Sequence, residues 1–503
     1  MAPSSSIADL STHYLFFFFL CTMDLVSSLP SSSDPRKQEA GTLYMVGSKN
    51  ISKEEHEKIN KQDITHPIRV EGLENVPIVK VSASPLHVLA LSQEGNIYSW
   101  GDPQYGALGR KGNPHFPAPI NHPSIRYIRF KEVVCGVTFS MALSSKGQLY
   151  TWGTYMGSEN IYGYLPHVKI QYHPRIVDNV SGVQFVSIAA GATDCLALDS
   201  NGQVYSWGCG EFNQLGIPGC HNKKTKLELI PNKIALNRIV RIACGQFHSL
   251  AINSYGQLFA WGVNKFYQCG IMSNALPKEE VEEEILGPES IIAPQLVPGF
   301  KNCVGTETDH LKSKLGKRSL DEIQQGFSKR LRISTENQDD MMDTDDSSEK
   351  RNSEAKQPIK PGPVSVAAGA DHTIVQMSDN SLVAFGRNDH GQLGIVIDPK
   401  NPLPGAVQTR KDGNYDALGI PLRNPWSPSV KIKKGISGFD HTLIIGTNGQ
   451  VWGYGSAEHH QLGTYKSKDV TLPTLIESIQ QSGKVIDGAA NDATTYFIVA
   501  NKE

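Results

Sequence analysis

Residues 243–270 read ACGQFHSLAINSYGQLFAWGVNKFYQCG, which is a Gly, two variable residues, a His, an apolar run, a turn with Gly, and an aromatic run ending in Trp-Gly. The two runs are about five residues long, alternate in polarity and flank a short polar turn, which predicts a β-hairpin. Downstream, a Pro such as Pro294 introduces a further apolar run, which predicts an outer, edge-like strand, because Pro lacks the N–H that a sheet interior needs. This unit decides the fold because it recurs.

Six full copies of the unit are present, at residues 81–109, 134–153, 189–216, 243–270, 367–394 and 437–463. Several copies continue from Trp-Gly to a Gln-Leu-Gly ending. The residues Trp100, Trp152, Trp207 and Trp261 are 52, 55 and 54 positions apart, a period that suits one four-stranded propeller blade. A helical solenoid would instead show an apolar period of about 3.6 residues.

The two ends of the chain each carry half a unit. Residues 41–47 (GTLYMVG) match its second half, and residues 485–499 (VIDGAANDATTYFIV) match its first half. A ring of blades removes its open edges by pairing such halves in one composite blade. We therefore predict an all-β protein, a closed seven-bladed β-propeller over residues 41–501 with a composite N/C-terminal blade, preceded by a disordered segment at residues 1–40.

The composition supports a large globular protein. The 503 residues are 39% hydrophobic and 19% charged, with 46 Gly and 29 Pro, which excludes a small disulfide scaffold and a wholly disordered chain. Lys and Arg number 48 against 50 Asp and Glu, so the basic excess of a protein devoted to nucleic-acid phosphates is missing. The eight cysteines form no CxxC pair or zinc-finger spacing, which indicates reduced thiols in an intracellular protein.

Near the N-terminus, residues 14–21 (YLFFFFLC) look like the apolar centre of a signal peptide. No Lys or Arg precedes them, and the run is too short to span a bilayer. Two interpretations stay open, a weak targeting segment or a stretch upstream of a start at Met23.

One spacing is much longer than the others. Trp261 and the equivalent Phe385 are 124 residues apart, and residues 302–363 between them are rich in charged residues, Ser and Gln and poor in aromatics. Such a composition cannot bury enough apolar surface to fold, so we predict a disordered insertion within the propeller. Inside it, two basic groups match a bipartite nuclear localisation signal that an import receptor would bind, although solvated charge is the alternative. The signal consists of Lys317, Arg318, Lys329, Arg330 and Arg332.

The repeats resemble the regulator of chromosome condensation family. The resemblance covers about residues 41–501 and implies a seven-bladed propeller. Members of that family include exchange factors for the small GTPase Ran, and also ubiquitin ligases, ciliary scaffolds and a plant ultraviolet-B photoreceptor, so the repeat alone does not assign the activity.

A sharper resemblance follows the second full copy. Residues 149–177 (LYTWGTYMGSENIYGYLPHVKIQYHPRIV) replace the Gln-Leu-Gly ending with a longer excursion that resembles the β-wedge of Ran exchange factors. In that family the wedge protrudes from the propeller and acts at the nucleotide site of the GTPase; an ordinary hairpin extension is the alternative here. The implied wedge residues are Thr154, Tyr155, Met156, Gly157, Ser158, Glu159, Asn160, Ile161 and Tyr162.

The family also places polar residues that touch the GTPase on the loops after each repeat Gly. By resemblance, the GTPase-facing residues here are Asp194, Gln246, Asp371 and Asp440. The pattern departs from the family at several positions, and these departures put the strength of exchange activity in question. They are Val137 and Thr193 where acidic residues are expected, with Asp194 shifted by one place, and Asp371 and Ala493 where His is usual.

Four histidines, His87, His248, His372 and His441, recur at one repeat position. A metal ion would need several of these histidines within about 4 Å, which separate blades do not allow. We therefore predict a structural role, in which each histidine ties a turn of its own blade with a hydrogen bond. Cys135 and Cys244 also share a repeat position, where we expect small buried side chains. The chain has no Ser/His/Asp arrangement, P-loop or dinucleotide fingerprint, so we expect no catalytic residue of covalent chemistry, no cofactor and no metal.

The leading hypothesis is a guanine nucleotide exchange factor for a Ran-like small GTPase that acts without covalent chemistry. It would support nucleocytoplasmic transport and mitotic chromatin signalling, in the nucleus or shuttling with the cytoplasm. The expected partners are the GTPase, an import receptor and chromatin through its histones, with no membrane. The alternative is a non-exchanging propeller scaffold or adaptor in the nucleus, which the missing carboxylates at Val137 and Thr193 favour.

Overall fold

A computed structural model describes residues 34–48, 63–157, 161–219, 226–272, 290–300, 361–398, 415–426, 428–464 and 467–501, with a few further positions between 400 and 408. Residues 1–33, the basic groups at residues 317–332 and nearly all of the predicted insertion lie outside these ranges. Residues 34–40 include a short 3₁₀ helix, η1 (Pro35–Lys37), which leads into the first strand.

Strands dominate the described chain and pair into antiparallel sheets. In this described part, four of the sheets have four strands, one has five, one has eight and contains two four-stranded groups, and one is a two-stranded hairpin. The four-stranded groups correspond to the sequence repeats. The first blade consists of β3 (Ile78–Ala83), β4 (His87–Ser92), β5 (Ile97–Gly101) and β6 (Ala118–Pro119). The second consists of β7 (Phe130–Cys135), β8 (Phe139–Ser144), β9 (Leu149–Gly153) and β12 (Gln171–Ile176). The third consists of β13 (Phe185–Ala190), β14 (Asp194–Asp199), β15 (Val204–Cys209) and β16 (Leu227–Lys233).

The fourth blade consists of β17 (Ile239–Cys244), β18 (His248–Asn253), β19 (Leu258–Val263) and β20 (Ser290–Leu296). The fifth consists of β21 (Pro363–Ala368), β22 (His372–Met377), β23 (Leu382–Arg387) and β25 (Tyr415–Arg423), with β24 (Ala406–Gln408) beside β25. The sixth consists of β26 (Ile432–Ser437), β27 (His441–Gly446), β28 (Val451–Gly455) and β29 (Val470–Leu475). Short helices η3 (Pro123–Ile125), η5 (Asp178–Val180) and α4 (Glu477–Ser482) lie in connections.

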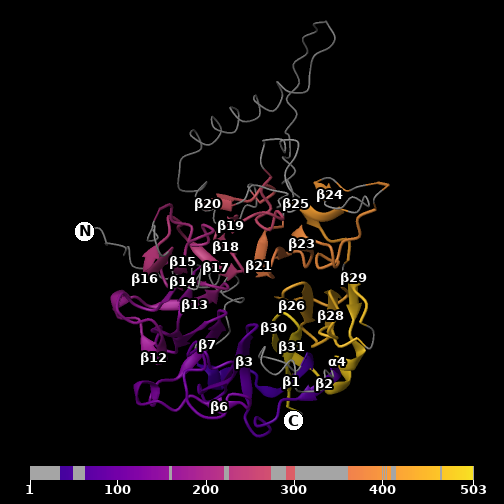
Figure 1. Cartoon of the computed structure of the whole chain (residues 1–503). Coiled ribbons are helices and arrows are strands. Elements are labelled where there is room, and N and C mark those ends of the chain that lie inside the picture. The colour runs from indigo at the N-terminus through magenta and orange to yellow at the C-terminus, as the bar shows by residue number, and fades with distance from the viewer. Residues whose placement is uncertain are drawn as a thin grey trace, which may run out of the picture.

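The blades are arranged around a central axis, with the first strand of each blade, such as β3, β13 or β21, nearest the axis (Figure 1). The second strands β4, β8, β14, β18 and β27 are buried along their whole length. Both faces of each of these strands are therefore covered, because every sheet packs against its neighbours on both sides. The polar residues that alternate along these strands consequently lie in the interior, where they must find hydrogen-bond partners.

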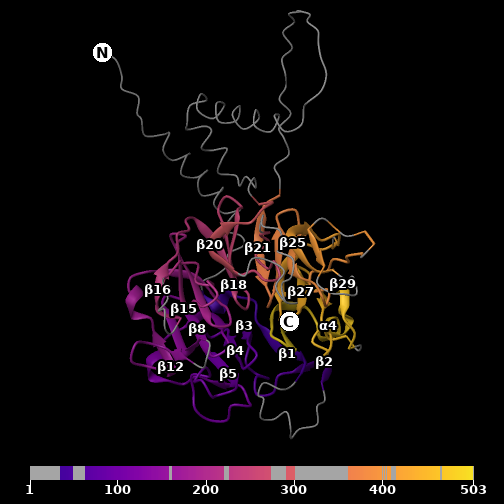
Figure 2. The same cartoon turned by 45° about the horizontal axis from the view of Figure 1, so that its top comes forward.

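The two ends of the chain meet in a terminal blade. It consists of β30 (Val485–Ala490), β31 (Thr494–Ala500), β1 (Gly41–Gly47) and β2 (Ile64–Arg69). β1 and β31 pair antiparallel along all of β1, from Gly41 opposite Ala500 to Gly47 opposite Thr494, the pairing that the two half units predicted. Gly41 has no room for a side chain, since a Cβ there would lie 2.0 Å from the Val499 carbonyl oxygen. Figure 2 shows β1, β2 and the C-terminus in one sector beside α4.

An ion network joins the terminal blade to both of its neighbours at the axis. Asp487 of β30 accepts Lys80 of the first blade at 3.0 Å and Lys434 of the sixth blade. The two ammonium groups hold the pKa of the Asp487 carboxyl well below its usual range, despite the burial that opposes ionisation. The carboxylate is therefore charged at neutral pH and links three consecutive inner strands.

Backbone hydrogen bonds also join the loops between the first and second strands of consecutive blades. Each donates an N–H to a carbonyl of the next blade, and the pairs are Val137 to Ala192, Ala192 to Gln246, Gln246 to Gly369, Ala370 to Phe439 and Phe439 to Asn491, at 2.9 to 3.2 Å. Asn491 then donates its side-chain amide to the Ser84 carbonyl of the first blade at 3.0 Å. In the first blade, Pro85 has no N–H to continue the series.

Candidate functional site

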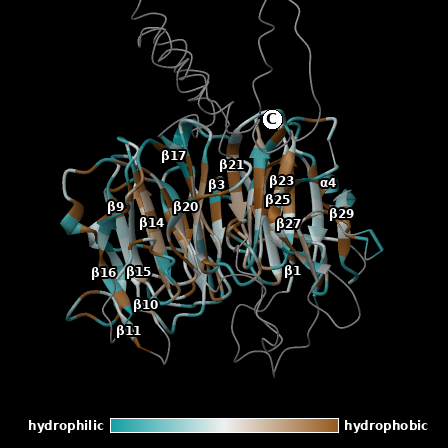
Figure 3. Cartoon of the chain, turned by 90° about the horizontal axis from the view of Figure 1, so that it is seen from above, coloured by the Kyte–Doolittle hydropathy of each residue, from teal (hydrophilic) through white to brown (hydrophobic). Residues whose placement is uncertain are grey.

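The loop face is the face formed by the connections between first and second strands, such as residues 245–247, and between third and fourth strands, such as residues 387–392. These loops surround the mouth of a central hollow of about 350 Å³ lined mainly by Gly, Ala and Ser. In the second blade, the connection between the third and fourth strands forms an extra hairpin, which lies on the lower face in Figure 3, opposite the C-terminus.

This hairpin is the predicted wedge. Its strands are β10 (Tyr155–Met156) and β11 (Tyr162–Gly163), paired antiparallel, and Gly157 donates its N–H to the Ile161 carbonyl at 2.8 Å. We call residues 154–157 and 161–163 the wedge hairpin; Ser158, Glu159 and Asn160 lie outside the described residues. The structure therefore contains a β-hairpin at the predicted position.

The first residue of the wedge hairpin is tied to the body of the second blade. The Thr154 N–H donates to the Thr138 carbonyl at 3.0 Å, and the Thr138 hydroxyl donates to the Thr154 carbonyl at 2.8 Å. The Thr154 hydroxyl donates to the Lys169 carbonyl at 2.7 Å. Both sides of the excursion are thus held at its base.

Aromatic packing fills the space beneath the wedge hairpin. The Tyr155 side chain is 2% exposed, and its ring lies 5.0 Å from the Phe139 ring and stacks on Tyr164 at 6.1 Å between centroids. The indole N–H of Trp207, in the third blade, donates to the Tyr155 hydroxyl at 2.7 Å. Burial raises the pKa of Tyr155 well above its usual value, so the hydroxyl stays neutral. The base of the hairpin is therefore part of the core between the second and third blades.

Two of the corresponding tryptophans, Trp152 and Trp261, bond to the backbone instead. Trp152 donates to the Ala107 carbonyl at 2.7 Å, and Trp261 donates to the Gln214 carbonyl at 2.8 Å. Both carbonyls belong to the segment that ends in Leu-Gly, which the second repeat lacks. A side-chain hydroxyl on the hairpin replaces the missing carbonyl. Sequence reasoning missed this contact, although the loss of the Leu-Gly ending next to a retained Trp207 was a signal for it.

The recurring histidines bind across blades rather than within one turn, which corrects the sequence prediction. His372 Nε2 lies 2.9 Å from the Thr442 hydroxyl of the next blade, which donates to the Gln392 carbonyl of the histidine's own blade at 3.0 Å. Since the hydroxyl proton points to the carbonyl, Nε2 must carry a proton and donate. We call this His–hydroxyl–carbonyl arrangement the hydroxyl relay.

The same relay recurs at two other seams, where a seam is the boundary between consecutive blades. His87 bonds Ser140 at 2.7 Å and His248 bonds Thr373 at 3.0 Å, and these hydroxyls donate to the Ala107 and Gln268 carbonyls. His441 makes the corresponding bond to the Thr495 hydroxyl at 2.9 Å. His87 also contacts Ser84 in its own turn at 3.1 Å. Burial lowers the pKa of each of these histidines to about 3, so they are neutral and structural at physiological pH.

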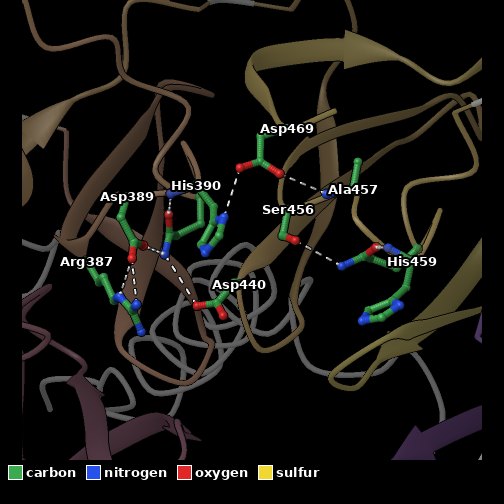
Figure 4. Close-up of polar contacts among 10 residues, drawn as sticks. Arg387, Asp389, His390, Asp440, Ser456, Ala457, His459 and Asp469 are labelled. Atoms are coloured by element: carbon green, nitrogen blue, oxygen red, sulfur yellow. Dashed lines mark hydrogen bonds and ion pairs between the residues drawn. The ribbon is translucent and has the colours of Figure 1, made fainter. Parts of the chain in front are cut away.

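Across the ring from the wedge hairpin, the loop face carries a group of charges around Arg387 (Figure 4). Arg387 donates to Asp389 at 2.5 and 2.9 Å and lies 3.8 Å from Asp371. Two glutamines at the same repeat position, in Gln-Cys-Gly and Gln-Leu-Gly, complete the group. Gln268 donates to Asp371 at 2.9 Å, and Gln392 donates to Asp389 at 3.1 Å and towards Asp440 at 3.4 Å. We call Asp371, Asp389, Asp440 and Arg387 the carboxylate cluster.

Three carboxyls around one guanidinium leave a negative surplus. Burial raises the pKa of Asp371 to about 6, partly offset by Arg387 and reinforced by the neighbouring carboxylates Asp440 and Asp389. The pKa of Asp440 is also raised, again chiefly by burial. Such a site gains from a cationic side chain of a partner, which would neutralise the surplus in partly desolvated surroundings. The predicted face residues Asp371 and Asp440 thus lie together.

Next to the cluster, His390 bonds Asp469 of the sixth blade at 2.8 Å. Burial lowers the pKa of His390, but the hydrogen bond to Asp469 and nearby carboxylates outweigh it and raise the pKa above its usual value. The second carboxylate oxygen of Asp469 accepts the Ala457 N–H at 3.3 Å. This pair was not predicted, because the two residues are 79 positions apart in loops of different repeats.

The other two predicted face residues differ from expectation. Gln246 is partly buried at the mouth of the hollow, where its backbone joins the loop series. Asp194 is 1% exposed and begins β14, so its carboxyl lies in the interior and is not accessible to a partner. It occupies the repeat position of His248, which is buried in every blade, and this equivalence could have predicted its burial from the sequence.

Among the residues that the structure describes, no three or more His, Cys, Asp or Glu side chains are grouped as a metal ion would require. In the same part of the chain, no helix is both long and apolar enough to cross a membrane.

The sequence profile of the RCC1-like domain matches residues 41–311, and the regulator of chromosome condensation (RCC1) repeat matches residues 364–392 and 448–498. Protein pim1 of Schizosaccharomyces pombe is 26% identical over 456 residues, 87% of this chain and 70% of the relative. The guanine nucleotide exchange factor SRM1 of Saccharomyces cerevisiae is 27% identical over 433 residues, 80% of this chain and 74% of the relative.

Among solved structures, Prp20p of Saccharomyces cerevisiae superposes with a TM-score of 0.70 at 22% identity, covering 95% of this chain and 97% of Prp20p. That structure was described together with the binding of Prp20p to Gsp1p and histones. The likeness shows the shared β-propeller fold. With the profile match over more than half of its length, the chain belongs to the regulator of chromosome condensation (RCC1) family.

Proposed function

We propose that the protein is a guanine nucleotide exchange factor for a Ran-like small GTPase. The observation that carries the proposal is the wedge hairpin, which replaces the Leu-Gly ending of the second repeat and stands on the loop face with a rigid base. The likeness to SRM1 supports the same activity. Exchange requires no covalent chemistry, because the factor only has to bind the GTPase.

The mechanism is differential binding. A GTPase holds its nucleotide through backbone donors around the phosphates and through Mg²⁺. A factor that binds the nucleotide-free form more tightly than the loaded form speeds release in either direction. A shift of about 10⁴ requires about 5.5 kcal/mol of differential affinity. In this proposal the loop face binds the GTPase in both forms, and the wedge hairpin supplies contacts that only the empty form allows.

The carboxylate cluster is the second contact region in this proposal. Its side chains are partly buried and carry a surplus of negative charge, so a Lys or Arg of the GTPase would form a charge-assisted hydrogen bond there. The wedge hairpin and the cluster belong to the second and to the fifth and sixth blades, so a GTPase touching both would span the mouth of the hollow.

We also propose that the blades number seven and form a closed ring. The β1–β31 pairing, the Lys80–Asp487–Lys434 network and the series of loop hydrogen bonds support closure. Deleting residues 1–48 removes β1 and should lower the melting temperature, whereas deleting residues 1–33 should not. Equal melting temperatures would contradict closure through β1.

For location and further partners, we propose nuclear import through the basic groups Lys317-Arg318 and Lys329 to Arg332, which an import receptor would bind, and histones as chromatin partners. The basic groups lie outside the described residues. Replacing Lys329, Arg330 and Arg332 with Ala should move a fluorescent fusion into the cytoplasm. An unchanged nuclear ratio would reject this signal.

A non-exchanging nuclear scaffold is the second candidate, and a specific observation favours it. Val137 and Thr193 carry no carboxylate, and the neighbouring Asp194 is buried, so this side of the loop face lacks the acidic contacts that the family resemblance implies. Release of labelled GDP from a purified Ran-like GTPase, with and without the protein, separates the two. Stimulated release supports exchange, and stable binding without release supports the scaffold.

A further inference from the structure

The wedge hairpin reaches the third blade through a polar contact between two side chains. Trp207, on β15, is 1% exposed, and its indole N–H points to the Tyr155 hydroxyl at 2.7 Å. Tyr155 is the first residue of β10 and is equally buried. A hydrogen bond between two buried side chains therefore connects the hairpin base to the third blade.

The remaining polar anchors of the hairpin belong to the second blade. Thr154 bonds Thr138 and Lys169, and the Tyr164 hydroxyl bonds the Thr151 side chain at 2.8 Å and its carbonyl at 3.1 Å. These contacts fix the root of the excursion. Gly163 also packs near Leu227 and Leu229 of the third blade, but such apolar contact is non-directional and does not by itself select one tilt. Among the residues that the structure describes, the indole–phenol bond is the hydrogen bond by which the hairpin crosses that seam.

We infer that Tyr155 is the positioning residue of the wedge hairpin and that its bond to Trp207 holds the hairpin in the orientation that acts on a bound GTPase. This inference rests on the proposed exchange function. Without the bond, the hairpin would populate several tilts, and the rate of nucleotide release would fall with the fraction in the competent tilt. Binding of the GTPase to the rest of the loop face would not change.

Tyr155→Phe tests the bond directly, because it removes the hydroxyl and keeps the ring that packs on Phe139 and Tyr164. We expect kcat for GDP release to fall about five- to tenfold, as for the loss of one buried hydrogen bond, with KM unchanged. Tyr150→Phe is the control, since it removes a hydroxyl from another buried tyrosine of the second blade, which lies on β9 and packs on Phe130 away from the hairpin. The control should retain wild-type kcat.

A double-mutant cycle with Trp207→Phe checks that the partner is the indole. If the bond carries the effect, Tyr155→Phe should lower kcat no further in the Trp207→Phe background. An additive loss would overturn the assignment of Trp207 as the partner.

Hydrogen exchange provides a readout that does not need the GTPase. The Gly157 amide, bonded to the Ile161 carbonyl, reports on the hairpin, and amides of β8 report on the blade. Tyr155→Phe should speed exchange at Gly157 several-fold without affecting β8, whereas Tyr150→Phe should leave exchange at Gly157 at the wild-type rate.

The outcomes separate the two levels of the claim. Faster exchange at Gly157 with a wild-type kcat would overturn the positioning role and leave the proposed function standing. Unchanged exchange at Gly157 would overturn it at the level of structure, whatever the activity. A wild-type protein that releases no GDP would reject the proposed function and the role in catalysis with it, while Gly157 still reports whether the bond orders the hairpin.

Discussion

The seam between the second and third blades and the seam between the fifth and sixth are built from the same repeat but held by different contacts. We number each seam by the earlier of its two blades. At the fifth seam, between the fifth and sixth blades, His372, Thr442 and the Gln392 carbonyl form the hydroxyl relay. At the second seam, Phe139 and Cys195 occupy the positions of the histidine and the hydroxyl, and an aromatic stack around Tyr155 fills the space.

The difference teaches how a repeat accommodates a functional insertion. Removing the Leu-Gly segment deletes the carbonyl that both the relay and the tryptophan would use, so a histidine there would have a partner missing. An apolar ring avoids leaving an unsatisfied buried donor, whose desolvation costs about 1–3 kcal/mol. The aromatic stack then connects the inserted hairpin to the core. The fifth seam keeps the relay and can carry the carboxylate cluster above it.

Among changes that act at only one of the two seams, shortening the wedge hairpin should have the largest effect, and that effect is on stimulated GDP release. Replacing residues 156–160 with Asn-Gly removes Met156 of β10 but leaves a tight turn between Tyr155 and Ile161, so the base of the hairpin and the fold should persist. Stimulated GDP release should fall at least about a hundredfold, because the remaining face binds loaded and empty GTPase equally and binding both equally shifts nothing. Release is measured with labelled GDP, and the melting temperature serves as the control. Wild-type release by the shortened protein would show that the hairpin is not the wedge.

The relay should matter for stability at the fifth seam and have no counterpart at the second. Thr442→Val keeps the shape of the side chain but removes the hydroxyl from between His372 and the Gln392 carbonyl, both buried. We expect a loss of about 2–3 kcal/mol, because a donor and an acceptor are left without partners. Cys195→Ala at the equivalent position should cost only about 1 kcal/mol, as the deletion of one small buried group. Urea unfolding compares the two, and equal losses would contradict the relay.

Much of this architecture could be predicted from the sequence, because it depends on local patterns. The repeat gave the hairpins, the half units gave the pairing of β1 with β31, and the missing Gln-Leu-Gly ending gave the place of the extra hairpin. The repeat positions of Asp371 and Asp440 also indicated equivalent loops, and the structure places these two carboxyls near each other, while their contact with a GTPase stays a prediction.

What could not be predicted depends on which residues face each other across a seam. The hydroxyl of Thr442 is 70 positions from His372, and Trp207 is 52 positions from Tyr155. A repeat pattern predicts the strands of each blade but not the offset between neighbouring blades. The hydrogen bonds of the histidines were therefore predicted within one turn rather than across a seam. Arg387 ends β23 and belongs to no motif of the repeat. Its ion pairs with Asp371 and Asp389, which the sequence does not indicate, place it at the centre of the carboxylate cluster.

The third seam lies between these two extremes, because Asp194 stands at the histidine position opposite Ser249. Neither carboxyl oxygen of Asp194 has a hydrogen-bond partner among the described residues, and burial raises the pKa of this carboxyl well above its usual value. Cys195, Cys209 and Cys244 are the titratable groups around it. Burial therefore favours the protonated form of Asp194 in the fold, and ionising it opposes folding.

Asp194→Asn should reveal this cost as a pH dependence. Since the folded pKa lies above the unfolded value, the stability from protonated Asp194 is complete in acid and is lost as pH rises towards the folded pKa. Relative to Asp194→Asn, the wild-type protein should thus lose about 1–2 kcal/mol between pH 4 and pH 8. Urea unfolding at several pH values measures the difference. A constant difference would mean that the carboxyl does not titrate with folding in this range.

The smallest effect is expected from the carboxylate cluster, where one of several charges is removed. Asp371 has a pKa raised to about 6 by burial, so it is ionised above that pH and can attract a cationic side chain of the GTPase. The sign is opposite to that for Asp194, because binding of a cation strengthens as pH rises through about 6 and weakens below it.

Asp371→Asn keeps the hydrogen bond from Gln268 sterically possible but removes the charge. GTPase affinity should fall about threefold at pH 7.5, in line with a partly exposed ion pair of under 1 kcal/mol, and should lose its dependence on pH between 5.5 and 7.5. Asp469→Asn is the control, since its carboxylate bonds His390 and Ala457 outside the cluster. If affinity remained pH-dependent in Asp371→Asn and became flat in Asp469→Asn, the partner's cation would be bound at the His390 side and the contact assigned to the carboxylate cluster would be wrong.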